Sequence, residues 1–177
     1  MTVHIDFETR STVDLKETGV YVYAEDPTTD VWCAAYAVDD GPVQLWVPGD
    51  PTPDIDWSGF FIGHNSNFER TIFKYIMGPR YGWPNPPVTR WRCTMATAMA
   101  MALPGSLENA AAAVNLTIGK DMAGHRLMMQ MARPRSKDPL VWWDVEEKKQ
   151  RLYEYCRQDV EVERQLEKRL VPLSQSE

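Results

Sequence analysis

The chain opens with a strict alternation of apolar and polar side chains, which is the two-residue period of a β-strand. Residues 2–8 (TVHIDFE) carry this alternation, and the apolar runs at 31–38 and 43–47 predict two further strands. The segment 39–42 (DDGP) between these two runs has turn chemistry and favours an antiparallel pair. The apolar run at 59–63 is too short for a helix and is interpreted as a buried strand.

The period lengthens to that of a helix from Asn67 onward. Phe68, Ile72 and Ile76 recur every four residues and share one helix face, and Gly78–Pro79 predicts the end of this helix. Later segments are predicted helical because of alanine-rich composition, a capping serine at position 106, or a continuous apolar stripe. The predicted helices cover residues 67–77, 93–103, 106–114, 124–132 and about 145–170.

Strands therefore come first and helices follow, which predicts a single α/β domain with a mixed sheet. The length of 177 residues suits one domain, and 44% hydrophobic with 25% charged residues is a globular balance. No apolar stretch reaches a membrane-spanning length, and the N-terminus lacks the pattern of a secretory signal. We therefore expect no membrane association and an intracellular location.

The charge and the cysteines exclude some classes of protein. A net charge of −6 argues against a protein that holds nucleic acid by global electrostatics. It does not exclude an enzyme that binds a short stretch of a strand through bridging metals. Cys33, Cys93 and Cys156 are widely spaced and odd in number, so they support neither a disulfide framework nor a zinc ribbon, and buried free thiols are expected.

Three acids stand in positions where a carboxylate needs an explanation. Asp6 and Glu8 lie two apart on the first strand, so both leave one face and repel each other unless a cation is present. Asp159 interrupts the apolar stripe of the last helix, which is costly unless the acid is paired or binds a metal. Pairing with Arg157 or Arg164 is the alternative, but both arginines point toward another face of that helix.

The block GHNSNFER (63–70) joins a strand to a helix and adds a fourth acid. Glu69 falls in the first turn of this helix, a position that the helix dipole favours for any acid. A simple helix-terminal charge is therefore one interpretation of Glu69. His64 and Asn65, at the strand end, are candidates either to cap backbone groups or to contact a ligand.

Taken in order, the blocks DFET, HNSNFE and YCRQD resemble the 3′→5′ exonuclease superfamily, which has three sequence blocks and four acidic metal ligands. Proofreading domains of DNA polymerases, ribonuclease D and oligoribonuclease belong to it. Tyrosine in the third block marks the subclass found in family-A DNA polymerases. Most members carry aspartate in the second block, where this chain has glutamate. The matched residues are Asp6, Glu8, Asn65, Phe68, Glu69, Tyr155 and Asp159.

The resemblance extends over nearly the whole chain. Residues 103–116 and 124–135 look like the same region of bacteriophage polymerases of the polymerase I type, and 169–177 looks like the junction into the polymerase part. This resemblance implies a ribonuclease H-like mixed sheet flanked by helices. It also implies that residues 1–177 are an exonuclease domain, either natural or excised from the N-terminal end of a longer DNA polymerase.

The mechanism implied by the resemblance uses two divalent ions about 4 Å apart. Ligands that are all oxygen favour Mg²⁺ or Mn²⁺ over zinc. Asp6 would bridge both ions, Glu8 and Asp159 would complete one site, and Glu69 would act on the second through water. Tyr155 would orient the attacking water, since an unshifted phenol is a poor base at neutral pH.

The substrate implied is a DNA 3′ end, single-stranded or frayed, with a polymerase domain in the same chain or in trans as a further partner. Two alternatives stay open: a 3′→5′ exoribonuclease of the same superfamily, and a non-catalytic module that binds a strand or scaffolds a polymerase. The predicted substrate contacts are Thr9, Arg10, His64 and Asn65, with the basic segments 90–92 and 133–137 as further candidates or ordinary solvated loops.

Overall fold

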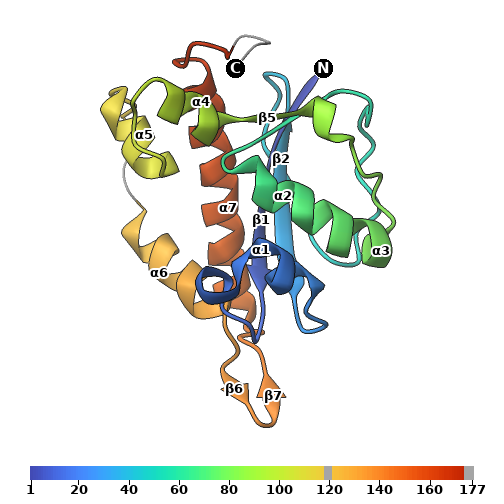
Figure 1. Cartoon of the computed structure of the whole chain (residues 1–177). Coiled ribbons are helices and arrows are strands. Elements are labelled where there is room, and N and C mark those ends of the chain that lie inside the picture. The colour runs from blue at the N-terminus through green and yellow to red at the C-terminus, as the bar shows by residue number, and fades with distance from the viewer. Residues whose placement is uncertain (118–120, 174–177) are drawn as a thin grey trace.

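A mixed five-stranded sheet forms the centre of the molecule (Figure 1). The structure is a computed structural model that describes residues 1–117 and 121–173. The strand order is β3-β2-β1-β4-β5; β2 runs antiparallel to its neighbours β1 and β3, whereas β1, β4 and β5 run parallel. The predicted α/β fold with a mixed sheet is thereby confirmed. The strands are β1 (Thr2–Arg10), β2 (Asp30–Val38), β3 (Gln44–Trp46), β4 (Phe60–Gly63) and β5 (Trp91–Cys93).

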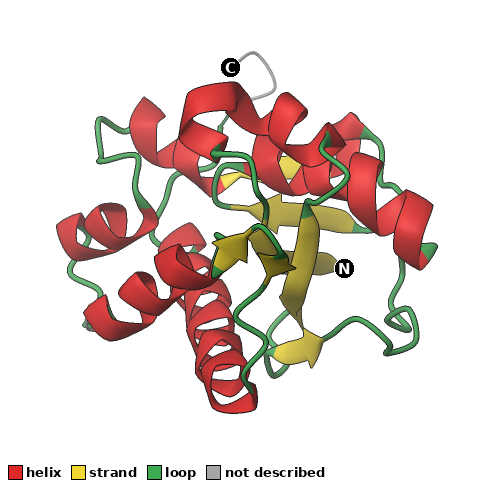
Figure 2. Cartoon of the chain, turned by 90° about the horizontal axis from the view of Figure 1, so that it is seen from below, coloured by secondary structure: helices red, strands yellow, loops and turns green. Residues whose placement is uncertain are grey.

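Helices cover both faces of the sheet (Figure 2). The longest, α7, packs on β1 and β2 across one face, and the segment α2-η1-α3 covers the other. A small hairpin extends from the bottom of the molecule in Figure 1. The helices are α1 (Leu15–Glu25), α2 (Ser66–Ile72), the π-helix η1 (Phe73–Met77), α3 (Gly78–Tyr81), the 3₁₀ helix η2 (Val88–Arg90), α4 (Thr94–Ala100), α5 (Leu107–Ala113), α6 (Met122–Met131) and α7 (Glu146–Glu167); the hairpin is β6 (Ser136–Lys137) and β7 (Leu140–Val141).

The alternation along β1 decides which layer each side chain joins. Val3, Ile5 and Phe7 are buried against the α2-η1 layer, so the polar residues between them face α7. On that face β2 presents small, fully buried residues such as Cys33 and Ala35. Because these side chains are small, α7 approaches the sheet closely beside the polar face of β1.

Aromatic rings fill the layer between the sheet and η1. The ring of Phe73 is fully buried and has five aromatic neighbours with centroid distances between 5.4 and 6.2 Å. Aromatic rings bury a large apolar area and prefer edge-to-face contacts. This group of rings, here called the Phe73 cluster, therefore anchors η1 on the sheet. Its members are Phe7, Trp57, Phe61, Phe73, Trp83 and Trp91, with Trp46 packed 5.0 Å from Trp83.

The predicted end of the first long helix at Gly78–Pro79 was wrong. The helix continues through η1 and α3 and ends at Gly82, whose φ of 70° gives the left-handed conformation of a helix terminus. In η1 the amide of Gly78 bonds the carbonyl of Phe73, five residues back. This change of register leaves Pro79 in the first turn of α3, where its missing N–H costs nothing.

Three elements were not predicted from the sequence. Helix α1 is interrupted at Gly19, which has a φ of 78°, so its apolar residues follow no single period. Strand β5 and the β6-β7 hairpin have only three and two residues per strand, too few to show a period. All three cysteines are free thiols, with Cys93 only partly buried. Within the described ranges, no helix has the length and apolarity needed to cross a membrane.

Candidate active site

The acids of β1 face a cleft because the neighbouring strand ends early. Strand β4 pairs with β1 only as far as His4 and Ile62 and stops at Gly63, so Asp6 and Glu8 lie beyond its end. Helix α2 starts at this point and α7 crosses behind it. The resulting cleft of about 450 Å³ is lined by all four predicted acids: Asp6, Glu8, Glu69 and Asp159.

Glu8 and Glu69 are buried and Asp6 and Asp159 are partly buried, and the pKa values of all four carboxylates reflect this. Burial raises the pKa of Asp6 to about 7 and that of Asp159 to about 8, and the negative charge of Asp6 adds to the shift at Asp159. Burial, and then the charge of Asp6, also raise the pKa values of Glu8 and Glu69 well above their usual range. In the part of the chain that the structure describes, no lysine or arginine forms an ion pair with any of the four. Such a cluster suits a cation supplied from outside the chain.

A cysteine completes a group of possible metal ligands beside the acids. Ligand atoms of Asp6, Glu8 and Cys156 all lie within 4.8 Å of one another. Burial raises the pKa of the Cys156 thiol well above its usual range, with Cys33 adding to the shift. Without a metal ion the thiol is therefore protonated and donates to Asp6, with Sγ 3.5 Å from Oδ2. The carboxylates of the cleft offer oxygen ligands, which fit Mg²⁺ or Mn²⁺ better than zinc.

Glu69 is placed by a close contact with Gly63. A methyl group on Gly63 would lie 2.8 Å from Oε2 and 3.0 Å from Cδ of Glu69, so the glutamate side chain occupies the space that only glycine leaves open. Glu69 is 2% exposed, and its Oε2 is buried without a hydrogen-bond partner in the protein. Buried polar oxygens are normally paired, so this oxygen fits a cation or a cation-bound water on its cleft side.

Tyr155 is fixed between two helices at the mouth of the cleft. Arg151, one turn earlier on α7, pairs with Asp121 at the start of α6 with an N–O distance of 2.5 Å. This pairing brings Gly124 so close that a methyl group there would lie 2.5 Å from Cδ2 of the Tyr155 ring. Burial and then Asp159 raise the pKa of Tyr155. The phenol is therefore a hydrogen-bonding group and not a base near neutral pH.

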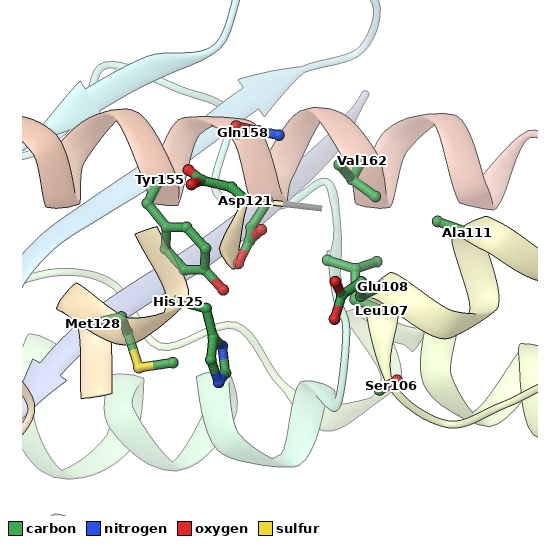
Figure 3. Close-up of a pocket in the computed structure, with 11 residues that line it drawn as sticks. Ser106, Leu107, Glu108, Ala111, Asp121, His125, Met128, Tyr155, Gln158 and Val162 are labelled. Carbon is green, nitrogen blue, oxygen red and sulfur yellow. The ribbon is translucent and has the colours of Figure 1, made fainter. Parts of the chain in front are cut away.

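A second hollow of about 250 Å³ adjoins the cleft and shares Tyr155, Asp159, His125 and Met128 with it. Figure 3 shows the Tyr155 ring reaching from α7 into this hollow, with His125 on the α6 side. Helix α5 forms the opposite wall through Leu107, Glu108 and Ala111. Tyr155 and Asp159 therefore line both the acidic cleft and this hollow, whose remaining walls combine apolar and polar side chains.

The structure brings three of the four predicted substrate contacts to the cleft. Thr9, His64 and Asn65 line it. Thr9 Oγ1 lies 2.8 Å from the hydroxyl of Tyr23, and both ring nitrogens of His64 are engaged within the protein. Arg10 is not among the lining residues. Its guanidinium lies 4.3 and 4.9 Å from the ring centroids of Trp32 and Trp142, on the far side of a register shift between Glu8 and Thr9.

The two basic segments occupy different surroundings. Arg133 lines the cleft and pairs with Asp14 at 2.5 Å, whereas Ser136 and Lys137 form strand β6. In the other segment, Trp91 of β5 belongs to the Phe73 cluster. The guanidinium carbons of Arg90 and Arg92 lie 5.2 and 4.5 Å from the ring centroid of Phe60. Of the two basic segments, residues 133–137 therefore adjoin the acids, through Arg133, and residues 90–92 do not.

Sequence reasoning missed three residues near the acids: Cys156, His125 and Glu163. Glu163 is 1% exposed and lies one turn after Asp159 on α7. A signal for it was present, because the spacing of four residues that places Asp159 in the apolar stripe also places Glu163 there. His125 gave no signal, since its surroundings come from the packing of α6 against α7.

Comparison of the sequence with known proteins found one relative. The chain is similar to a phage DNA polymerase. It is 34% identical over 188 residues to a protein named DNA polymerase from Bacillus phage SP02. The similarity covers 96% of this chain and 28% of that polymerase, so the chain spans just over a quarter of its relative's length. No family model matches the chain.

Proposed function

We propose that this chain is a metal-dependent 3′→5′ exonuclease that hydrolyses phosphodiester bonds at the 3′ end of DNA, in the manner of a proofreading domain with a ribonuclease H-like fold. The observation that carries the proposal is the convergence of Asp6, Glu8, Glu69 and Asp159, from three separate elements, on one cleft. The similarity to part of a phage DNA polymerase supports DNA as the substrate.

The residues fit two divalent cations. Asp6 is close to the other three acids, since its charge raises the pKa values of all of them, and it would contribute to both ion sites. Glu8 and Asp159 would complete one site, and the unpaired Oε2 of Glu69 would face the other. Two bound ions would supply a hydroxide and neutralise charge at phosphorus and on the leaving oxygen.

Tyr155 has the geometry of a residue that orients the nucleophile. Its raised pKa keeps the hydroxyl protonated, and Gly124 fixes the ring. We expect Tyr155→Phe to lower kcat by about ten- to a hundredfold, because a misplaced nucleophile costs rate without a change in charge. Single-turnover rates with a labelled oligonucleotide measure this, and Mn²⁺ affinity by calorimetry is the control. Unchanged kcat in Tyr155→Phe would remove the residue from the site.

Gly63 gives a test of Glu69 that leaves the acid in place. In Gly63→Ala the added methyl group meets the end of the Glu69 side chain, which can turn aside at little cost in stability. We expect the rate of nucleotide release to fall about tenfold or more with a nearly unchanged melting temperature. Gly59→Ala, at the start of the same strand, is the comparison; its methyl group meets Met1 and Asp56 instead. Equal activity of Gly63→Ala and the wild type would argue that Glu69 does not act in the reaction.

The function itself is tested with matched single-stranded DNA and RNA oligonucleotides labelled at either end. Stepwise loss of nucleotides from the 3′ end of DNA in Mg²⁺ or Mn²⁺, abolished in Asp6→Ala, is the expected result. Faster cleavage of RNA would change the substrate to RNA. Equal products from the wild type and Asp6→Ala would identify a module that binds a strand without cleaving it.

A further inference from the structure

Glu163 is a buried acid for which the mechanism above has no use. It follows Asp159 by one turn of α7 and is 1% exposed, yet it does not line the cleft. Its Oε1 lies 3.3 Å from Oγ1 of Thr94. Among the described residues it forms no ion pair, so the hydroxyl of Thr94 is the polar group that accounts for its burial.

Thr94 connects Glu163 to the turn that carries Glu69. Strands β4 and β5 pair in register at Gly63 and Cys93, so His64 and Thr94 are the next residues on two adjacent parallel strands. Nδ1 of His64 lies 2.9 Å from Oγ1 of Thr94, and Nε2 lies 2.8 Å from the carbonyl oxygen of Gly105. We call the side chains of Glu163, Thr94 and His64 the His64 chain.

The hydrogen atoms in this chain can be assigned by elimination. The Gly105 carbonyl only accepts, so Nε2 of His64 carries a hydrogen. In a neutral imidazole Nδ1 then accepts from Thr94, which uses the single hydrogen of that hydroxyl, and a protonated Glu163 donates to Thr94. In a charged imidazole both bonds run the other way, toward an ionised Glu163. In each arrangement both hydrogen bonds of the His64 chain run the same way, toward His64 when the imidazole is neutral and toward Glu163 when it is charged.

Burial favours the neutral arrangement. It lowers the pKa of His64 and raises the pKa of Glu163 well above its usual range, and the charge of Asp6 raises the latter further. A neutral acid at this place adds a hydrogen bond without adding another negative charge beside Asp6.

We propose that Glu163 is a positioning residue for Glu69: it orients Thr94, and Thr94 holds the His64 ring at the start of the turn from which α2 begins. The residues directly before and after His64 in the sequence determine the position of the Glu69 side chain. Gly63 provides the surface on which that side chain packs, and Asn65, with a φ of 75°, forms the tight turn into α2. The catalytic consequence of this positioning rests on the proposed nuclease function, whereas the structural consequence does not.

The pair Thr94→Val and Thr94→Ser tests the chain at its centre. Valine matches threonine in shape and lacks the hydroxyl; serine keeps the hydroxyl. Thr97→Val is the matched control. Thr97 lies on the same helix as Thr94, and its hydroxyl donates to the Cys93 carbonyl, which is not part of the His64 chain. We expect kcat to fall about tenfold in Thr94→Val with little change in KM, and to stay within about threefold of the wild type in Thr94→Ser and Thr97→Val.

Nuclear magnetic resonance gives a readout that does not depend on catalysis. The imidazole nitrogens of His64, assigned by comparison with His64→Gln, are expected to show a hydrogen on Nε2 in the wild type and in Thr94→Ser. In Thr94→Val and Glu163→Leu the hydrogen stays on Nε2, but the resonance of Nδ1 is expected to move because its bond to the Thr94 hydroxyl is lost or reoriented. The backbone amides of residues 65–69 are expected to shift with it. Glu163→Gln keeps a group that can donate to Thr94, so it should resemble the wild type in both respects.

The outcomes separate the two proposals. Unchanged amides at 65–69 in Thr94→Val, or equal losses of kcat in Thr94→Val and Thr94→Ser, overturn the positioning role. The wild type could lack nuclease activity while the His64 and amide signals still change in the variants as expected. That result would support the positioning of Glu69 and overturn the nuclease function alone.

Discussion

Asp6→Asn is expected to slow the release of nucleotides by at least about a thousandfold, which corresponds to ~4 kcal/mol of transition-state stabilisation. Asp6 is the acid whose charge affects all three of the others, and an amide cannot supply the shared negative oxygen that two cations need. The measurement is the single-turnover rate on a 3′-labelled DNA strand in Mg²⁺. The asparagine is similar in size to the aspartate, so loss of activity is not expected to come from unfolding.

Two variants show whether this loss belongs to the site. Glu167→Gln changes an acid at the end of α7 whose Oε2 lies 2.8 Å from Nε2 of His4, away from the cleft, and should retain activity. In EDTA at pH 8, Asp6→Asn should also melt at a higher temperature than the wild type, because it removes the charge that raises the pKa values of the other three acids. A variant that is both inactive and unfolded would not support the metal assignment, whereas an active Asp6→Asn contradicts it directly.

The second large effect is on stability, which should depend on pH in opposite ways with and without metal. The pKa values of Asp6 and Asp159 are raised in the folded protein from 3.8 to about 7 and about 8. Acids whose pKa is raised by folding stabilise the protein below their unfolded pKa, and this contribution is lost as the pH rises through the folded pKa. In EDTA the melting temperature should therefore fall between about pH 5 and pH 8, by on the order of 10 °C.

Divalent cations reverse this trend because they bind the ionised carboxylates. At pH 8 a concentration of Mn²⁺ about a hundredfold above its dissociation constant adds about 2.7 kcal/mol of stability. That corresponds to roughly 5–10 °C in melting temperature. Thermal melts across pH, with and without the ion, measure both effects, and Asp6→Asn should reduce each. A melting temperature in EDTA that rises from pH 5 to pH 8 would show that the acids are not buried as described.

Much of the site was accessible from the sequence because its geometry is local. The two-residue period of a strand puts Asp6 and Glu8 on one face, and the apolar stripe of a helix places Asp159 toward the core. Glu69 needed the resemblance to a known block, since any acid suits the first turn of a helix. The assigned roles of these residues stay predictions until activity is measured.

What the sequence did not reveal depends on contacts between distant elements. Arg10 is two residues after Glu8 and was expected near the substrate, but its guanidinium lies over the rings of Trp32 and Trp142 and 3.9 Å from Asp30. Glu163 stands in a charged segment (EVER) that is typical of a solvated helix face, although its spacing of four residues from Asp159 also places it in the apolar stripe of α7. Its burial comes from the neighbouring Thr94 and α4, which long-range packing brings to α7.

The tryptophans of the Phe73 cluster and the adjoining Trp46 provide an intrinsic spectroscopic probe of folding. The ring centroid of Trp83 lies 5.0 Å from that of Trp46 and 5.4 Å from that of Trp57, and the ring planes cross at 73° and 61°. Indoles this close couple their electronic transitions, so the native chain should give a distinct near-ultraviolet dichroism that vanishes when η1 leaves the sheet. Because these rings lie on the face of the sheet opposite α7, this optical signal follows unfolding and is little affected by cations at the carboxylates.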